Sequence, residues 1–563
     1  MAAWPICIFG IKANLGKSKN FVVLTNDISP KLEERKQGFK LLTRSQKSEI
    51  RNQNPMKSII FSLLLAFATV SLYSQDVSPY GDNDHDVLIT ALHAVSEQDI
   101  TDWMHVMISP EMRGRLAGDI GYDLAAEWAA GKFEKWGLQP FFGEEGFFQE
   151  FDQPYTLVKD KGRLEVHLPV RGMKEGDGDD AFVTKSFSYG DDYWPWGISG
   201  SGEITAEVVY AGHGLTVPEL GYDDYAGIDV SGKIVIVELG VPYSGNNSDS
   251  LLMWAPYVDH SNKVRFALKH GAAGLLFAYH VASPRPTMDE DFLFLAVTDR
   301  VVETLLAGTG KDHEEVREHI KTTLTPMSFS TGKEATMALT TEYHADGKTS
   351  NVVAMIEGSC PDLKHEYMII GAHLDHLGMM PVLFPGALDN ASGCALALGV
   401  AKALATAEAD LKRSLVIILF GAEEVGLRGA RHFVEHFPYD KKQIKLMINL
   451  DMVGRGNGFF AVTADIWEDL LNVLEANNER WVHRPFLTRS SPWQPPIRPR
   501  TDGMVFYMEK IPAITFGTRG APTRALYHVP EDNMDQIDVE IMRDVIKLLT
   551  MSVIEFGNPI SDF

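Results

Sequence analysis

Five short apolar runs in the C-terminal half of the chain each lead into a side chain that can bind a metal. The runs are Tyr367–Ala372, Gly386–Leu388, Leu415–Ala422, Lys445–Leu450 and Ala525–Tyr527, and the residues that follow them are His373, Asp389, Glu423 with Glu424, Asp451, and His528. Short apolar runs bounded by Gly, with helical stretches between them, indicate buried parallel strands. Open α/β sheets place their sites at the carboxyl ends of such strands. Two histidines and several carboxylates in this position therefore predict a metal centre.

The pattern between these runs predicts an α/β fold, with a mostly parallel twisted sheet and helices on both faces. Residues 350–356 read as a further strand. Helices are expected at residues 122–136, 394–407, 429–436, 466–478 and 539–556. Strands that alternate with helices are typical of a mostly parallel sheet that is covered on both sides.

A chain of 563 residues exceeds one simple core, so we expect more than one domain. Short β-like runs at Ile204–Tyr210 and Lys233–Leu239 indicate a separate small α/β domain. We place it at residues 196–334, as an insertion into the metal-binding domain. The main domain is then expected in two pieces, residues 75–195 and residues 335–563.

The N-terminal region contains an export signal that begins late. Met56 and Lys57 precede an apolar stretch, residues 59–70, and small or polar residues follow. This pattern is typical of a secretory signal peptide, which we place at residues 56–74. The stretch is shorter than the ~20 residues of a spanning helix, so no stable membrane span is expected in the mature chain. Residues 1–55 are interpreted as an upstream extension outside the mature protein; the alternative is a cytoplasmic tail on a signal anchor.

Charge and cysteine content narrow the choice of partners and ligands. The formal net charge of −24 argues against nucleic acid as a partner, because phosphates would be repelled. After the signal only Cys360 and Cys394 remain, without metal-binding spacing. An exported protein could pair them, but we expect Cys394 to be free and buried at the start of an apolar helix. Any metal is therefore held by nitrogen and oxygen.

Histidine and carboxylate ligands suit zinc, which keeps a position open for water in catalytic sites. Two zinc ions ~3.5–4 Å apart form a recurring hydrolytic arrangement that needs a bridging carboxylate. This chain offers that inventory: Asp389 as the bridge, His373 and Asp451 for one metal, and Glu424 and His528 for the other.

Two further carboxylates have predicted roles beside these ligands. Asp375 lies two residues past His373 and can orient that imidazole through its outer nitrogen. Glu423 and Glu424 are neighbours at a strand end, so their side chains diverge. One can bind metal while the other accepts a proton from water. The spacing leaves open which residue has which role.

Five motifs in order resemble the cocatalytic di-zinc aminopeptidases, a family that also includes glutamate carboxypeptidases. The motifs are residues 371–378 (GAHLDHLG), 387–393 (ALDNASG), 421–429 (GAEEVGLRG), 449–454 (NLDMVG) and 527–528 (YH). Residues 222–225, 230–235 and 269–274 also resemble a protease-associated domain, which some members carry as an insertion.

The resemblance implies a role for each site residue. Asp389 would bridge two zinc ions, with His373 and Asp451 at one and Glu424 and His528 at the other. Glu423 would be the general base and acid, Tyr527 would donate to the oxyanion, and Asp375 would support His373. The family often has a cis peptide after the bridging Asp. The chain departs from the family at residues 501–503, where Thr-Asp-Gly stands in place of Ser-Asp-His, and this puts substrate positioning in doubt.

The function expected on this basis is that of an exported zinc exopeptidase, with an aminopeptidase favoured. A metal-bound hydroxide would cleave the first residue from peptide substrates. The alternatives are a carboxypeptidase or dipeptidase on the same scaffold, a one-zinc glutaminyl cyclase, and a binding protein that has lost catalysis. The sequence does not give the preferred side chain or the oligomeric state.

Overall fold

The computed structural model describes residues 82–143, 146–169, 182–243, 248–462, 466–486, 500–520 and 523–558. Residues 82–563 belong to one compact unit. The upstream extension expected at 1–55 and the signal peptide expected at 56–74 lie outside the described residues. Among the described helices, none combines the length and the apolar character that a membrane span requires.

The first sheet carries the apolar runs of the C-terminal half. Its strand order is β1-β15-β17-β16-β18-β20-β19, and β2 also pairs with β15. The four neighbours β17, β16, β18 and β20 are parallel, and the strands outside them are antiparallel. The strands are β1 (Gln139–Pro140), β2 (Phe148–Asp152), β15 (Lys348–Ile356), β16 (Tyr367–His373), β17 (Ser414–Phe420), β18 (Ile444–Leu450), β19 (Gly458–Val462) and β20 (Ala513–Arg519).

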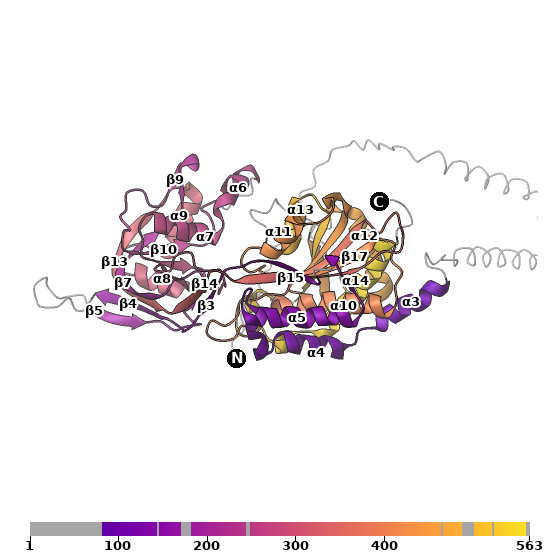
Figure 1. Ribbon diagram of the computed structural model, residues 1–563. Coiled ribbons are helices and arrows are strands. Elements are labelled where there is room, and N and C mark those ends of the chain that lie inside the picture. The colour runs from indigo at the N-terminus through magenta and orange to yellow at the C-terminus, as the bar shows by residue number, and fades with distance from the viewer. Residues whose placement is uncertain are drawn as a thin grey trace, which may run out of the picture. The chain divides into compact units, whose positions relative to one another are not determined.

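Helices cover both faces of this sheet, as the sequence pattern predicts. Figure 1 shows α11 and α13 on one face and α5 and α10 on the other. On β16, Tyr367 and Ile369 belong to the same buried cluster as Phe433 of α11 and Phe506 of α13, because alternate residues of a strand share a face. The five expected helices are present within a few residues: α5 (Ile120–Lys135), α10 (Ser392–Thr406), α11 (Arg428–Glu435), α12 (Glu468–Asn477) and α14 (Val539–Gly557), and α13 spans Asp502–Met508.

Two of the five apolar runs are not strands, so that prediction was wrong. Residues 387–391 form a helical turn that leads into α10, and residues 523–526 form a short 3-10 helix. A run of three residues is too short to build a strand ladder. The amides of Leu388 and Asp389 instead donate to the carboxylate of Asp532, at 2.8 and 3.0 Å.

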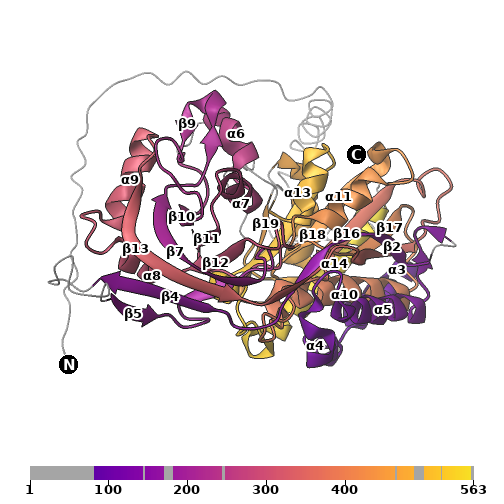
Figure 2. The ribbon, with the colours of Figure 1, turned by 60° about the vertical axis from the view of Figure 1, so that its left-hand side comes forward.

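A second sheet contains the segment expected as a separate α/β domain, and we call this sheet and its helices the inserted domain; Figure 2 shows α7 and α9 beside the sheet. Its order is β5-β4-β13-β7-β10-β11-β12-β6, with β7, β10, β11 and β12 parallel. The strands are β4 (Arg163–Pro169), β5 (Phe182–Ser186), β6 (Tyr193–Pro195), β7 (Gly202–Ala211), β10 (Ile234–Glu238), β11 (Gly274–Ala278), β12 (Leu293–Val297) and β13 (Ser328–Leu339); the helices include α6 (Ser248–Trp254), α7 (His260–Lys269), α8 (Asp299–Leu306) and α9 (His313–Thr323).

The second sheet takes in more of the chain than residues 196–334. Strands β4, β5 and β6 precede residue 196, yet β4 pairs with β13 and β6 pairs with β12. The chain passes between the two domains through a two-stranded ribbon, in which β3 (Tyr155–Val158) pairs antiparallel with β14 (Thr341–His344). The entry and exit strands of the inserted domain therefore lie side by side.

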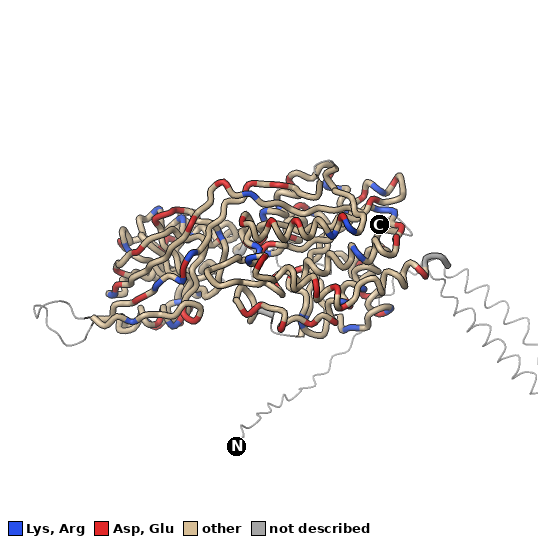
Figure 3. Tube along the Cα trace, turned by 60° about the horizontal axis from the view of Figure 1, so that its bottom comes forward, with Lys and Arg blue, Asp and Glu red and all other residues tan. Residues whose placement is uncertain are grey.

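Charged residues are spread over both domains. Figure 3 shows Lys and Arg interspersed with Asp and Glu along the described chain. The net charge of −24 is therefore not confined to one described segment.

Candidate metal centre

Asp389 lies between the two histidines predicted as ligands. Its Oδ1 is 3.2 Å from Nε2 of His373, and its Oδ2 is 3.4 Å from Nε2 of His528. All three residues are almost fully buried. The two oxygens of one carboxylate thus face two imidazoles on opposite sides, as a bridging ligand requires.

Each half of the cluster contains one further carboxylate. Asp451 Oδ1 lies 3.8 Å from Nε2 of His373, and Glu424 Oε2 lies 2.9 Å from Nε2 of His528. Ligand atoms that are bound to one tetrahedral zinc at about 2.0–2.1 Å are separated by about 3.3 Å, so both groups have suitable spacing. The structure therefore brings together all five predicted ligands, from two strand ends, two turns and one loop.

The donor set fits a metal ion better than it fits hydrogen bonds alone. Nε2 of His528 is buried and makes no aligned hydrogen bond within the described residues, although Glu424 is near. Burial lowers the pKa of His528, but the charges of Glu424 and Asp389 outweigh it and hold that pKa well above its usual range. The negative charge that raises this pKa also favours the binding of a divalent cation.

The turn around Asp389 is held in place from two sides. The peptide bond between Asp389 and Asn390 is cis, as the family resemblance implies. The Asn390 side chain donates to the Leu450 carbonyl at 2.8 Å and accepts from the Met452 amide at 3.3 Å. It therefore ties the turn that carries Asp389 to the end of β18, next to Asp451. The carboxylate of Asp532 holds the other side, and burial raises its pKa to about 7.

Asp375 lies behind His373, but its main-chain oxygen and its carboxylate bind different groups, which the sequence did not predict. The main-chain oxygen of Asp375 accepts from Nδ1 of His373 at 3.1 Å, while its carboxylate lies 3.8 Å from that nitrogen. The carboxylate instead accepts from the amides of Glu423 and Glu424, at 3.0 and 3.2 Å. Asp375 therefore orients both the imidazole and the turn that carries the glutamate pair.

Glu423 and Glu424 follow the end of β17. Glu424 Oε2 lies 2.9 Å from Nε2 of His528, and one oxygen of each glutamate and one ring nitrogen of His373 lie within 4.8 Å of one another. Burial raises the pKa of Glu423 well above its usual range, despite the opposing charge of His373. A carboxylate with a raised pKa is a stronger base than an ordinary one and is suited to accept a proton from water.

Tyr527 stacks on the neighbouring His528, with ring centroids 3.7 Å apart. Burial raises the pKa of the phenol well above its usual range, and the charges of Glu424 and Asp389 add to the effect. Tyr527 therefore remains protonated at neutral pH and can donate a hydrogen bond.

Two residues at the site were missed by the sequence analysis. His376 is fully buried, and its Nδ1 lies 3.1 Å from Glu424 Oε1. Arg115 is also fully buried and donates to the carbonyls of Leu374, Pro385 and Gly386, which flank the loop between His373 and Asp389. Neither residue ends an apolar run, so the pattern used for prediction passes over them.

The Thr501-Asp502-Gly503 segment does not remove a carboxylate from the site. Asp502 is buried at the start of α13, and neither of its oxygens has a hydrogen-bond partner within the described residues. Burial raises its pKa well above the usual range, and the nearby Asp375 and Asp451 charges raise it further. The departure from the family therefore concerns the residue after this Asp.

Cys394 is free and buried, as expected.

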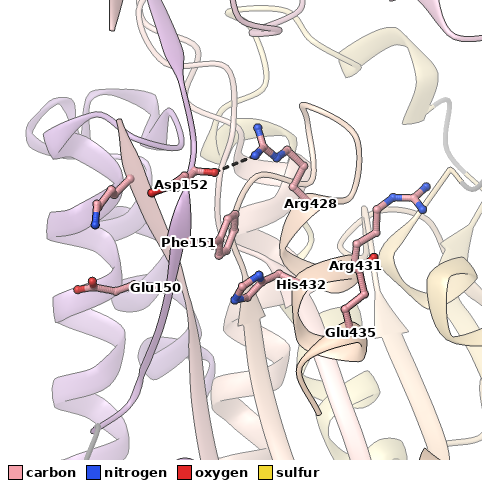
Figure 4. A pocket seen from close by; sticks show the side chains of 8 residues that line it. Glu150, Phe151, Asp152, Arg428, Arg431, His432 and Glu435 are labelled. Carbon is pink, nitrogen blue, oxygen red and sulfur yellow. Dashed lines mark hydrogen bonds between the residues drawn. The ribbon is translucent and has the colours of Figure 1, made fainter. Parts of the chain in front are cut away.

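A hollow of about 610 Å³ lies apart from this cluster, between β2, the start of β15 and α11 (Figure 4). Phe151 stacks on His432 there, and Arg428 donates to the main-chain oxygen of Asp152. None of the five predicted ligands lines it.

Comparison with known proteins identifies a family and several relatives. Residues 351–553 match the model of peptidase family M28. Aminopeptidase YwaD of Bacillus subtilis (strain 168) is 27% identical over 237 residues, which are 40% of this chain and 48% of that protein. An aminopeptidase of Pseudomonas aeruginosa is 39% identical over 111 residues, 20% of this chain and 19% of that protein.

A probable lipoprotein aminopeptidase of Mycobacterium tuberculosis, LpqL, is 26% identical over 254 residues, 44% of this chain and 42% of that protein. The chain thus spans about half or less of the length of these curated relatives. The solved aminopeptidase from Aneurinibacillus sp. strain AM-1 has the same fold, with a TM-score of 0.56 at 21% identity, over 84% of this chain and 95% of that one.

We expect Asp375→Asn to weaken zinc binding by roughly 10–100-fold. An amide can offer only one oxygen acceptor to the two amides of Glu423 and Glu424, so the turn that carries Glu424 loses a hydrogen bond. Zinc retained after dialysis against a chelator measures the effect. Asp312→Asn is the matched control, because Asp312 caps α9 and Asn caps a helix equally well. Equal zinc retention in both variants would contradict the role of Asp375.

Proposed function

We propose that this chain, whose residues 351–553 match the model of peptidase family M28, is a zinc-dependent aminopeptidase with two zinc ions per chain. One observation carries the proposal: the two carboxylate oxygens of Asp389 face His373 and His528 separately. Peptides with a free amino end are the proposed substrates, which is supported by the relatives that are named aminopeptidases.

The chain's own residues provide the proton transfer and the charge stabilisation. Bound zinc would lower the pKa of water and polarise the scissile carbonyl. Glu423, which is not needed as a ligand, accepts a proton from the attacking water and passes it to the departing amine. Tyr527, kept protonated by burial, donates to the oxygen on which negative charge develops. Asp375 holds the imidazole of His373 and the glutamate turn in register.

Substrate assays test the reaction class. The purified protein is expected to cleave aminoacyl-anilides and unblocked peptides, and to leave N-acetylated peptides intact. A chelator should abolish the activity, and added zinc should restore it, because the ligands remain in place. Release of a C-terminal label would instead indicate a carboxypeptidase. Cyclisation of N-terminal glutamine with one zinc per chain would indicate a glutaminyl cyclase.

Replacement of Glu423 separates catalysis from metal binding. Glu423→Gln removes the proton acceptor but keeps the shape, so kcat should fall by about 10²–10⁴-fold while zinc content stays at the wild-type value. Zinc analysis and steady-state kinetics give the two readings. Glu435→Gln, at the exposed end of α11, serves as the control and should match wild type. Turnover that survives in Glu423→Gln would assign the proton transfer to another group.

Export is proposed from the segment that begins at Met56. One relative is named a lipoprotein, which supports a location outside the cytoplasm for such chains. We expect the mature protein to begin near Gln75, after the signal has been removed. N-terminal sequencing of the protein from its native host checks this, and a mature chain that still starts at Met1 would exclude it.

A further inference from the structure

The outer nitrogen of His528 is held by the other domain. Nδ1 of His528 lies 2.7 Å from the main-chain oxygen of Ala282, which is 246 residues away in sequence. Ala282 belongs to the loop that follows β11 of the second sheet, and both residues are buried. A predicted ligand of the metal centre in one domain is therefore bonded to the backbone of the inserted domain.

This contact fixes the chemical form of the imidazole. A main-chain carbonyl only accepts hydrogen bonds, so Nδ1 must carry the proton. A neutral ring then presents the lone pair of Nε2, the atom that faces Asp389 and Glu424. The tautomer and orientation of a metal-binding histidine are set by the partner of its other nitrogen. Ala282 supplies that partner here.

The loop is built so that this carbonyl points at the site. The carbonyls on either side have other partners: Val281 O accepts from Nε1 of Trp196 at 2.5 Å, and Ser283 O accepts from the Gly197 amide at 3.1 Å. Hydrogen bonds to Trp196 and Gly197 therefore fix the backbone on both sides of Ala282, whose own oxygen accepts from His528.

The contact between the domains is packed like a core. Leu377, Met380 and Phe384, from the loop between His373 and Asp389, are buried in the same hydrophobic cluster as the second sheet. The ring of Phe384 lies 5.4 Å from that of Trp194, and the Tyr189 hydroxyl donates to the Met380 carbonyl. Such packing leaves little freedom for the carbonyl of Ala282 to drift from the imidazole.

We propose that the inserted domain is a structural part of the metal centre, in which the carbonyl of Ala282 positions His528 and sets the zinc affinity of the half formed by His528 and Glu424. The inference rests on the proposed two-zinc function. It makes Ala282 a positioning residue, which touches neither the metal nor the substrate.

Two changes in the full-length protein test the proposal. The first replaces Ser283 by its α-hydroxy analogue, which converts the Ala282–Ser283 amide into an ester and weakens the carbonyl as an acceptor. Within the described residues no hydrogen bond is recorded for the Ser283 amide that this exchange removes. The second is Trp196→Phe, which removes the donor that holds Val281 O. Trp254→Phe is the control, since Trp254 is equally buried in the same domain and packs on Tyr222.

Stepwise competition with a chelator provides a readout that does not depend on activity. We expect wild type and Trp254→Phe to hold two zinc ions, and both test variants to release one of the two with a roughly tenfold higher Kd while the other is unchanged. Unchanged affinities in the ester variant would overturn the inference, and so would equal weakening of both sites with a lower Tm. A wild-type chain that binds fewer than two zinc ions would refute the proposed function instead.

Discussion

The site depends on positive charge that offsets a cluster of largely buried carboxylates. Asp389, Glu424 and Asp451 meet two imidazoles in a space almost closed to water. Ionised groups that lose their hydration need opposite charge close by. Within the described residues the histidines are the nearest cationic groups, and the carboxylates hold the pKa of both well above its usual range. Divalent cations supply that charge and leave the imidazoles neutral, the form in which they bind metal.

The parallel strands position only some of the predicted ligands. His373 ends β16 and Asp451 follows β18, and these strands are neighbours in the sheet. Asp389 and His528 come from turns, and a turn needs partners for its amides that a sheet would have provided. Asp532 is such a partner, because its carboxylate takes the amides of Leu388 and Asp389. The buried carboxylate of Asp532 thus binds the amides of the turn that carries Asp389, the residue proposed to bridge the two metals.

The same distinction explains what the sequence could predict. Runs of six or more apolar residues, such as Tyr367–Ala372 and Leu415–Ala422, carry a strand signal and fix the position of the residue that follows. The three-residue runs before Asp389 and His528 carry none, so their helical turns were assigned wrongly. His376 was missed because it belongs to no periodic pattern.

The main-chain carbonyl that binds His528 could not be predicted from the sequence. Every residue has a carbonyl, and only the fold brings the one of Ala282 to His528. The N-terminal boundary of the inserted domain could not be predicted from the sequence either. Strands β4 and β6 lie before residue 196, and their membership of the second sheet follows from pairing with β13 and β12, which local sequence does not encode.

A site assembled from such distant segments has a thermodynamic consequence. The contact between Ala282 and His528 spans 246 residues, and that between Asp532 and Leu388 spans 144. The unfolded chain therefore contains no preformed site, and zinc affinity becomes part of the folding free energy. Since zinc binds the native state alone, each tenfold excess of free zinc over its Kd adds about 1.4 kcal/mol to stability. Because one imidazole is held by the inserted domain, that stabilisation extends across both domains rather than staying with the sheet that carries the ligands.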